Sequence, residues 1–128
     1  MADERSAKIA IGGQDYELIL TTKATKEIAK RYGGLSNLGE KLMKSENFEM
    51  ALDEVVWLIT LLANQSVLVH NLQNPTKKRE LLTEDAVELL TSPLDLSDYK
   101  NSIMEAMFKG TKRNIESEEE PSKNAQVG

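Results

Sequence analysis

The segment from Phe48 to about Gln73 constrains the fold of this chain more than any other, because it predicts a long helix that is apolar on two sides. Asn47 is placed to cap its start, and Pro75 disfavours helix just beyond its end. At about 100° per residue, one sector holds a core stripe, and the roughly opposite sector holds a second apolar line. The stripe consists of Phe48, Leu52, Val55, Ile59 and Leu62, and the second line of Trp57, Leu61 and Leu68.

A helix that is apolar nearly all round must be covered on both sides. Two interpretations of the second line stay open on the sequence alone. In the first, other segments of the same domain cover it, and its residues belong to an ordinary core. In the second, it meets another subunit or a helix of a partner. Truncation of Trp57 separates the two, because only a core ring contributes strongly to the stability of the monomer.

Two short alternating runs precede this helix and predict a β-hairpin over about residues 8–20. Between them, Gly12–Gly13 permits the positive φ angles of a tight two-residue turn. A hairpin of this size is only marginally stable alone in water. We therefore expect it to lie on the helices or to join strands of another copy. Its alternating apolar residues are Ile9, Ile11, Tyr16, Leu18 and Leu20.

Capping and stop residues mark the remaining helices. Thr21 or its neighbour caps a helix that runs to about Tyr32, where Gly33–Gly34 supplies a left-handed stop. A short helix follows over about residues 36–44. Beyond the long helix, residues 73–80 form a polar connector.

Two more helices are predicted after the connector. Thr83 caps the first, with Leu82 and Val87 at the spacing of a hydrophobic staple. Ser92–Pro93 marks a break, or supplies the cap and first residue of the last helix, and Gly110 is positioned to end that helix. The last helix carries an apolar stripe of Leu96, Tyr99, Ile103 and Met107, with Met104 and Phe108 beside it.

From about Asn114 the chain is almost wholly polar, with too little apolar surface to offset the entropy of ordering. We therefore predict a single α-rich domain over residues 1–113 and a disordered tail over residues 114–128. The fold class is mainly α, with a small N-terminal β-hairpin followed by a bundle of four or five helices and a disordered acidic C-terminal tail.

Composition and charge exclude several functional classes. The sequence has no cysteine, so it has no disulfide framework and no thiolate metal site. A formal net charge of -5 has the wrong sign for indiscriminate attraction to nucleic acid or anionic lipid. The basic clusters at 77–79 and 109–113 have no interleaved aromatic residues to stack on bases. We expect a cytosolic protein that binds neither nucleic acid nor membrane.

Motifs for catalysis and for phosphate or metal binding are missing from the sequence. His70 is the single histidine, so an H-E-x-x-H metal pair is impossible. The sequence has no G-x-S-x-G elbow, Walker loop or G-x-G-x-x-G fingerprint. We therefore expect no enzymatic activity, no cofactor and no metal. Met104, Met107 and Phe108 suit a surface that accepts varied apolar partners, although methionines also fill ordinary cores.

Residues 9–42, IAIGGQDYELILTTKATKEIAKRYGGLSNLGEKL, resemble the opening of the tail assembly chaperones of long-tailed phages and prophages of Gram-positive bacteria. Those proteins tend to begin with a G-x-x-Y-x-L hairpin, a T-T-K segment and a helix that ends in a glycine-rich stop. The stretch from Ser92 to Ala125 is similar to the end of such proteins. The matching residues in the opening are Gly13, Tyr16, Leu18, Thr21, Thr22, Lys23, Tyr32, Gly33 and Gly34.

The resemblance implies a holding function. The family binds the tape-measure protein, a very long and largely helical chain, and keeps it soluble until tail-tube subunits polymerise around it and displace the chaperone. It also implies a homo-oligomer, a possible longer form made by frameshifting, and contact with the tail-tube protein. The expected location is the cytoplasm of the bacterial host and not the mature virion. Candidate contacts with the partner or between copies are Trp57, Leu61, Leu68, Met104, Met107 and Phe108.

Two alternatives belong to other classes of protein. A structural virion component, such as a tail-tube or head-tail connector subunit, is the first. Tube subunits need long β-strands to build a continuous wall, and this sequence predicts few. A small regulator that binds nucleic acid is the second, and salt-dependent retention on DNA would distinguish it.

Overall fold

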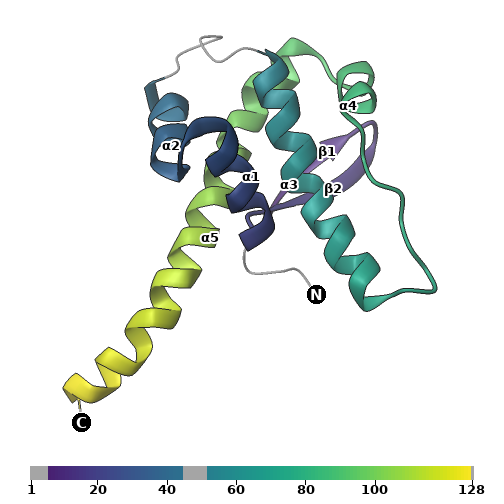
Figure 1. Ribbon diagram of the computed structural model, residues 1–128. Coiled ribbons are helices and arrows are strands. Elements are labelled where there is room, and N and C mark those ends of the chain that lie inside the picture. Colours follow the sequence, from purple (N-terminus) through teal and green to yellow (C-terminus); the bar gives the residue numbers. More distant parts are fainter. Residues whose placement is uncertain (1–5, 45–51, 128) are drawn as a thin grey trace.

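The computed structural model describes residues 6–44 and 52–127, with side chains described for residues 6–41 and 52–111. As the sequence predicts, the fold is mainly helical, with an antiparallel N-terminal hairpin (Figure 1). The predicted cap Asn47 and core residue Phe48 lie outside the described residues. The elements are β1 (Ser6–Ile11), β2 (Gln14–Ile19), α1 (Thr22–Tyr32), α2 (Leu35–Lys44), α3 (Leu52–Gln73), α4 (Glu84–Leu90) and α5 (Pro93–Val127).

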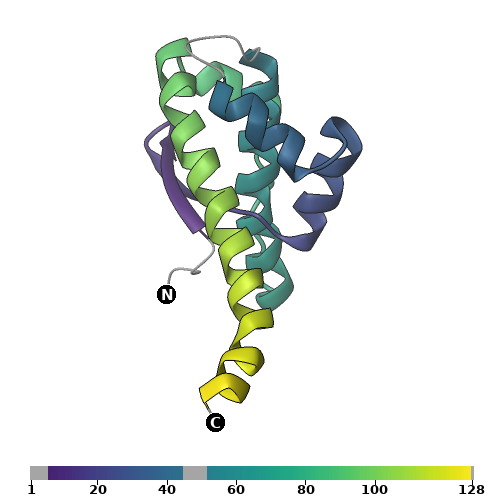
Figure 2. The same cartoon turned by 90° about the vertical axis from the view of Figure 1, so that its left-hand side faces the viewer.

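Helices α3 and α5 pack against each other at the centre of the domain. The hairpin lies across one side of this pair, with β2 against α3 and β1 against α5. Helices α1 and α2 lie on the other side (Figure 2). The hairpin thus packs on the helices of its own chain, which is the first of the two alternatives that the sequence left open. The largest fully buried side chains are Ile11, Leu18, Ile19, Ile28, Leu38, Leu58, Ile59, Leu62, Ile103, Val56 and Val67.

The hairpin has the tight turn that its glycines predict. Gly12 and Gly13 have φ angles of 59° and 80°, which most other residues avoid. Helix α5 holds β1 near both of its ends. The Tyr99 hydroxyl donates a hydrogen bond to the Ala10 carbonyl, and Lys109 Nζ donates one to the Ser6 carbonyl at 3.0 Å. These contacts join residues about 90 and 100 positions apart in sequence.

Helix α1 begins and ends as predicted. The Thr21 hydroxyl oxygen accepts a hydrogen bond from the Ala24 backbone N–H at 3.0 Å, and Gly33 ends the helix at φ 87°. The same hydroxyl donates to Oε1 of Gln65, a buried polar residue of α3. The amide of Gln65 in turn donates to the Leu61 carbonyl. The cap of α1 is therefore fastened to the central helix.

Helix α3 is buried on more sides than the predicted stripe. Val55, Ile59 and Leu62 are buried as predicted. Leu52 is exposed, and its assignment to the core was wrong. It lies in the first turn of α3, beside the start of α5, where it lines an open hollow. Periodicity shows on which face of the helix Leu52 lies. It does not show whether another element covers that face at the end of the helix, and for this reason the prediction failed.

The segment between α3 and α4, residues 74–83, includes the predicted polar connector and folds back along α3; it is called the connector from here on. The side-chain amide of Asn64 binds both backbone groups of Leu82, donating to its carbonyl and accepting from its N–H, each at 2.7 Å. One heptad later, the amide of Asn71 binds both backbone groups of Arg79 in the same way, at 3.0 and 2.8 Å. His70 Nε2 lies 2.9 Å from the Lys77 carbonyl. The single histidine thus has a structural role in holding the connector.

The last two helices start at the predicted caps. The Thr83 hydroxyl accepts from the Ala86 N–H at 3.1 Å. Before α5, the Ser92 N–H donates to the Asp95 carboxylate at 2.9 Å, and the Asp95 N–H donates to the Ser92 hydroxyl at 3.3 Å. This reciprocal pair is a capping box. Val87 is fully buried, which fits its predicted role in the staple.

Gly110 does not end the last helix, so that prediction was wrong. Helix α5 continues through it, and Gly110 is buried where α5 crosses the end of the hairpin. A Cβ atom at this position would lie 2.9 Å from Leu20 Cβ and 3.2 Å from the Leu20 carbonyl oxygen. The glycine is needed for close packing, and a glycine stop and a packing glycine look the same in sequence.

The C-terminal segment extends the last helix. The sequence predicts disorder from Asn114, whereas α5 runs on to Val127 and projects away from the packed body of the domain (Figure 1). A helix makes its backbone hydrogen bonds locally, so an extension of this kind forms without tertiary contacts but is only marginally stable in water. The disorder of this segment in solution stays a prediction.

Among the described residues, α3 alone has the length and hydropathy to cross a membrane. However, 44% of its most apolar window is buried inside the domain, where the hairpin and α5 pack against it. Core helices share this length and composition with membrane spans. The apolar character of α3 is accounted for by the elements that cover it.

Candidate functional site

Trp57, the first predicted contact residue, lies in an aromatic cluster between α1 and α3. Its ring meets that of Tyr32 edge-on, with centroids 6.3 Å apart, and the Arg31 guanidinium carbon lies 4.5 Å from its ring centroid. Tyr32 donates a hydrogen bond to the Glu54 carboxylate at 3.1 Å, and Lys41 binds the same oxygen at 2.7 Å. Trp57 is half-buried and packs against the core. Helix α1 thus covers one end of the second apolar line.

The environment of Tyr32 raises its pKa to about 12, first because burial disfavours the phenolate and then because Glu54 is negatively charged. The folded state therefore binds this proton more tightly than the unfolded chain, whose tyrosine pKa is near 10. Its contribution to stability is complete below pH 10 and is lost as the pH rises toward 12.

We expect an absorbance titration at 295 nm to show a tyrosine that ionises near pH 12 and is missing from Tyr32→Phe. Glu54→Gln should lower this midpoint while leaving it above 10, because burial is the larger cause. Far-UV circular dichroism must show that the chain is still folded. If all tyrosines of the folded chain ionised together near pH 10, the placement of Tyr32 in a half-buried cluster beside Glu54 would be contradicted.

The connector covers the other end of the second apolar line. Asn64 and Asn71 bind the backbone of the connector, and helical spacing places Leu68 on the same face between them. Leu68 is half-buried, and Leu61 is half-buried against the core. Segments of the same chain therefore lie over both ends of this line. The geometry favours the first interpretation, in which Trp57, Leu61 and Leu68 are part of the domain.

The three candidates on α5 differ from one another. Met104 and Met107 are half-buried and pack against the core. Phe108 is 64% exposed. The structure therefore does not gather the six predicted contacts into one exposed surface. Their roles in binding a partner stay predictions.

Exposed leucines gather at a place that the sequence analysis missed. Leu89 and Leu94 are 77% and 71% exposed, on α4 and on the first turn of α5. Five of the seven large hydrophobic residues exposed in the described part of the chain lie on or beside α4. We call these five the leucine surface: Leu52, Leu81, Leu89, Leu90 and Leu94.

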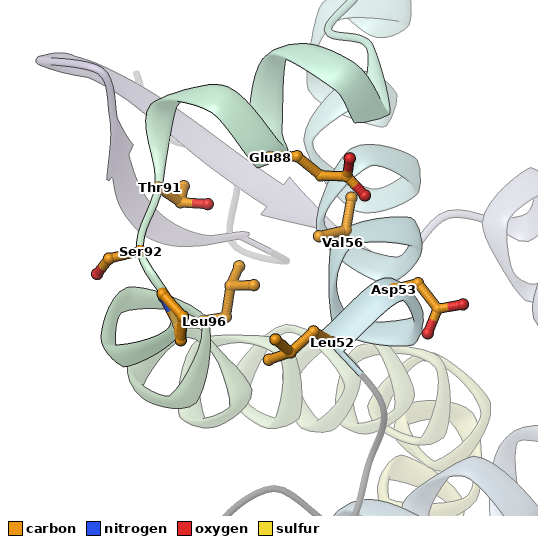
Figure 3. Close-up of a pocket in the computed structure, with 8 residues that line it drawn as sticks. Leu52, Asp53, Val56, Glu88, Thr91, Ser92 and Leu96 are labelled. Atoms are coloured by element: carbon orange, nitrogen blue, oxygen red, sulfur yellow. The ribbon is translucent and has the colours of Figure 1, made fainter.

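Two hollows flank α4, and three of these leucines, Leu52, Leu81 and Leu90, line them, whereas Leu89 and Leu94 do not. One, of about 200 Å³, is floored by Val56 and Leu96, with Leu52, Asp53 and Glu88 around it (Figure 3). The other, of about 550 Å³, includes Leu81 and Leu90. Leu89 points away from the buried Val87 by helical spacing, and so lies on the ridge between the hollows.

The surface is acidic as well as apolar. Residues 80–99 contain six carboxylates and no lysine or arginine, whereas the other 108 residues carry 15 acidic and 16 basic side chains. Helical spacing sets Asp85 beside Leu89 and Leu94 beside Asp98. This segment thus carries a net charge of about -6, although Lys77, Lys78, Arg79 and Lys100 flank it directly in sequence.

The described residues hold no group of three or more histidine, aspartate and glutamate side chains that could bind a metal ion. Family models, curated proteins and solved structures gave no match to this chain. The resemblance of residues 9–42 and 92–125 to phage tail assembly chaperones therefore stays an expectation. The leucine surface is the candidate functional site of this chain.

A sequence signal for this surface exists in the run VELLTSPL, residues 87–94. Val87 is the staple residue, so Leu89 lies about 200° away from the core on the same short helix. Leu94 directly follows the first residue of the next helix. Two large apolar residues that point away from the nearest buried position predict an exposed patch.

Proposed function

We propose that this chain is a phage tail assembly chaperone that binds the tape-measure protein and keeps it soluble before the tail tube polymerises. The leucine surface carries the proposal. Large apolar patches on a small domain mark surfaces that bind other polypeptides, because exposure of that area to water is unfavourable. The chaperone resemblance, carried by the hairpin, the first helix and the C-terminal stretch, supplies the kind of partner.

The fold supports a holding function better than the structural alternative. A tail-tube subunit needs long strands that continue from one subunit to the next. The described residues form two strands of six residues each, and both are part of one hairpin packed on helices. A holdase instead needs exposed apolar surface, solubility and reversible binding. The leucine surface and its surrounding carboxylates meet these needs.

We also propose partners beyond the tape-measure protein. The chaperone would self-associate, contact the tail-tube protein and occur in a frameshifted longer form, and it would reside in the cytoplasm of the bacterial host. Phe108 is the one predicted contact with a largely exposed side chain, and it lies on α5 apart from the leucine surface. It is a candidate for contacts between copies.

Co-expression with the tape-measure protein of the same genome tests this proposal. We expect the tape-measure protein to become soluble and to co-purify with the wild-type chain. The double variant Leu89→Ser/Leu94→Ser should lose about tenfold or more in recovered complex, since central apolar contacts dominate such interfaces.

Leu72→Ser is the matched control. Leu72 is 84% exposed at the far end of α3, outside the leucine surface, so its loss should leave complex formation unchanged. Circular dichroism should show that all variants fold. Failure of the wild-type chain to solubilise or bind the tape-measure protein would remove the chaperone proposal.

A further inference from the structure

We infer that the leucine surface binds an amphipathic helix with a basic polar face. The inference rests on the proposed function in taking another polypeptide as the partner, and it specifies the chemical class of the bound segment. Three observations carry it: the exposed leucines, the hollows on both sides of α4 and the six carboxylates of residues 80–99.

The backbone of the surface indicates that the bound segment is helical. Helix α4 and the first turn of α5 present side chains, and their backbone groups are bonded within the helices or at caps. An extended peptide laid on these two helices would find no strand edge along them and would leave its own N–H and C=O groups unpaired, although β2 contributes Gln14 and Tyr16 to the lining of the larger hollow. A helix satisfies these groups internally and presents only side chains. Leu89, on the ridge between two hollows, suits contact with apolar side chains spaced three and four residues apart.

The charges indicate the sign of the partner. Asp53 and Glu88 line the smaller hollow (Figure 3). Glu84 and Asp85 are exposed on α4, and Asp98 is exposed on α5. Arg79 is the one basic residue lining the larger hollow. Exposed leucines with carboxylates beside them match a helix whose apolar stripe is bordered by lysine or arginine. The complementary charges speed encounter and exclude acidic helices.

The same charges exclude two other occupants. A second copy docked through its own leucine surface would bring acidic residues such as Glu88 against the same acidic residues, and facing like charges disfavour such an interface. An anionic membrane would be repelled for the same reason. Contacts between copies are therefore expected elsewhere on the molecule.

Synthetic peptides test the inference on the full-length chain. Three labelled peptides of about 20 residues, roughly 30 Å of helix, are compared by fluorescence anisotropy. The first has an all-leucine apolar face and a lysine polar face. The second replaces the lysines by glutamates. The third has the composition of the first in an order that removes the apolar face. We expect the first to bind at least tenfold more tightly than the others, and more weakly as salt is added.

Variants locate the binding. Leu89→Ser/Leu94→Ser should weaken binding of the lysine peptide about tenfold or more, and Leu72→Ser should not. Glu88→Gln/Asp98→Asn should also weaken it. Glu40→Gln/Asp15→Asn is the control for net charge, because it makes the same two chemical changes at exposed positions on α2 and on β2. Strand alternation directs Asp15 to the opposite face from Gln14 and Tyr16, which line the larger hollow.

Equal binding of the lysine and glutamate peptides would overturn the inference, and so would equal binding of the scrambled peptide. Binding unaffected by the leucine variant would overturn it as well. If the lysine peptide does not bind specifically but the tape-measure protein is still solubilised in co-expression, the proposed function stands and this mode of binding is excluded. Specific binding of the lysine peptide without that rescue would support the surface while removing the tape-measure assignment.

Discussion

Leu58→Ala is expected to lower the free energy of unfolding by about 2–5 kcal/mol, because it opens a cavity in the middle of the core. Leu58 is fully buried in α3, the helix against which the hairpin and α5 pack. A domain of this size has a total stability of about 5–15 kcal/mol, so the variant should lose a large part of it. Urea denaturation followed by far-UV circular dichroism measures the change.

Leu72→Ala makes the same chemical change on the same helix. Leu72 is 84% exposed in the last turn of α3, so its truncation leaves no cavity and should change stability by less than about 0.5 kcal/mol. Leu58→Ala and Leu72→Ala share the residue type, the helix and the substitution, so the difference in their effects reports the difference in burial. Similar effects at the two positions would contradict the placement of α3 at the centre of the core.

Gly110→Ala is expected to destabilise the domain by about 1–2 kcal/mol, although alanine is a better helix former than glycine. The added methyl would meet the side chain and the carbonyl of Leu20 at 2.9–3.2 Å, and a backbone carbonyl cannot move aside cheaply. Overpacking of this kind costs about 1–3 kcal/mol. The gain in helix propensity, up to about 1 kcal/mol, offsets only part of this cost.

Gly39→Ala should have the opposite sign. Gly39 lies within α2, and a Cβ atom there would meet no heavy atom within 4 Å. The propensity gain is then unopposed, and stability should rise by about 0.5–1 kcal/mol. Thermal and urea denaturation of both variants give the comparison. A Gly110→Ala variant as stable as the wild type, or more stable, would contradict the close packing of α5 against Leu20.

The boundaries of most elements could be predicted from the sequence because they are set by neighbouring residues. Thr21 and Thr83 cap helices through hydrogen bonds to residues three positions later. Gly12–Gly13 and Gly33 adopt positive φ angles that few other residues tolerate. Each of these features depends on a few adjacent residues, so its signal is complete within a short window.

The candidate site could be predicted only in part from the sequence. Trp57, Leu61 and Leu68 stood out as a surplus of apolar residues, but the sequence could not show that α1 and the connector lie over that face. Leu89 and Leu94 attracted no notice, since α4 is short and its exposed side depends on where Val87 is buried. Burial is a property of what lies opposite a residue, and no local pattern specifies the neighbour.

The sequence by itself determined the helical class, the hairpin, the caps and the absence of a recognisable catalytic motif, since propensity and local hydrogen bonding act over a few residues. Only the tertiary structure decided that Gly110 is a packing glycine, that Leu52 is exposed and that leucines and carboxylates gather around α4. These features arise where segments far apart in sequence meet. Which apolar side chains remain in water is decided by which faces the other elements cover.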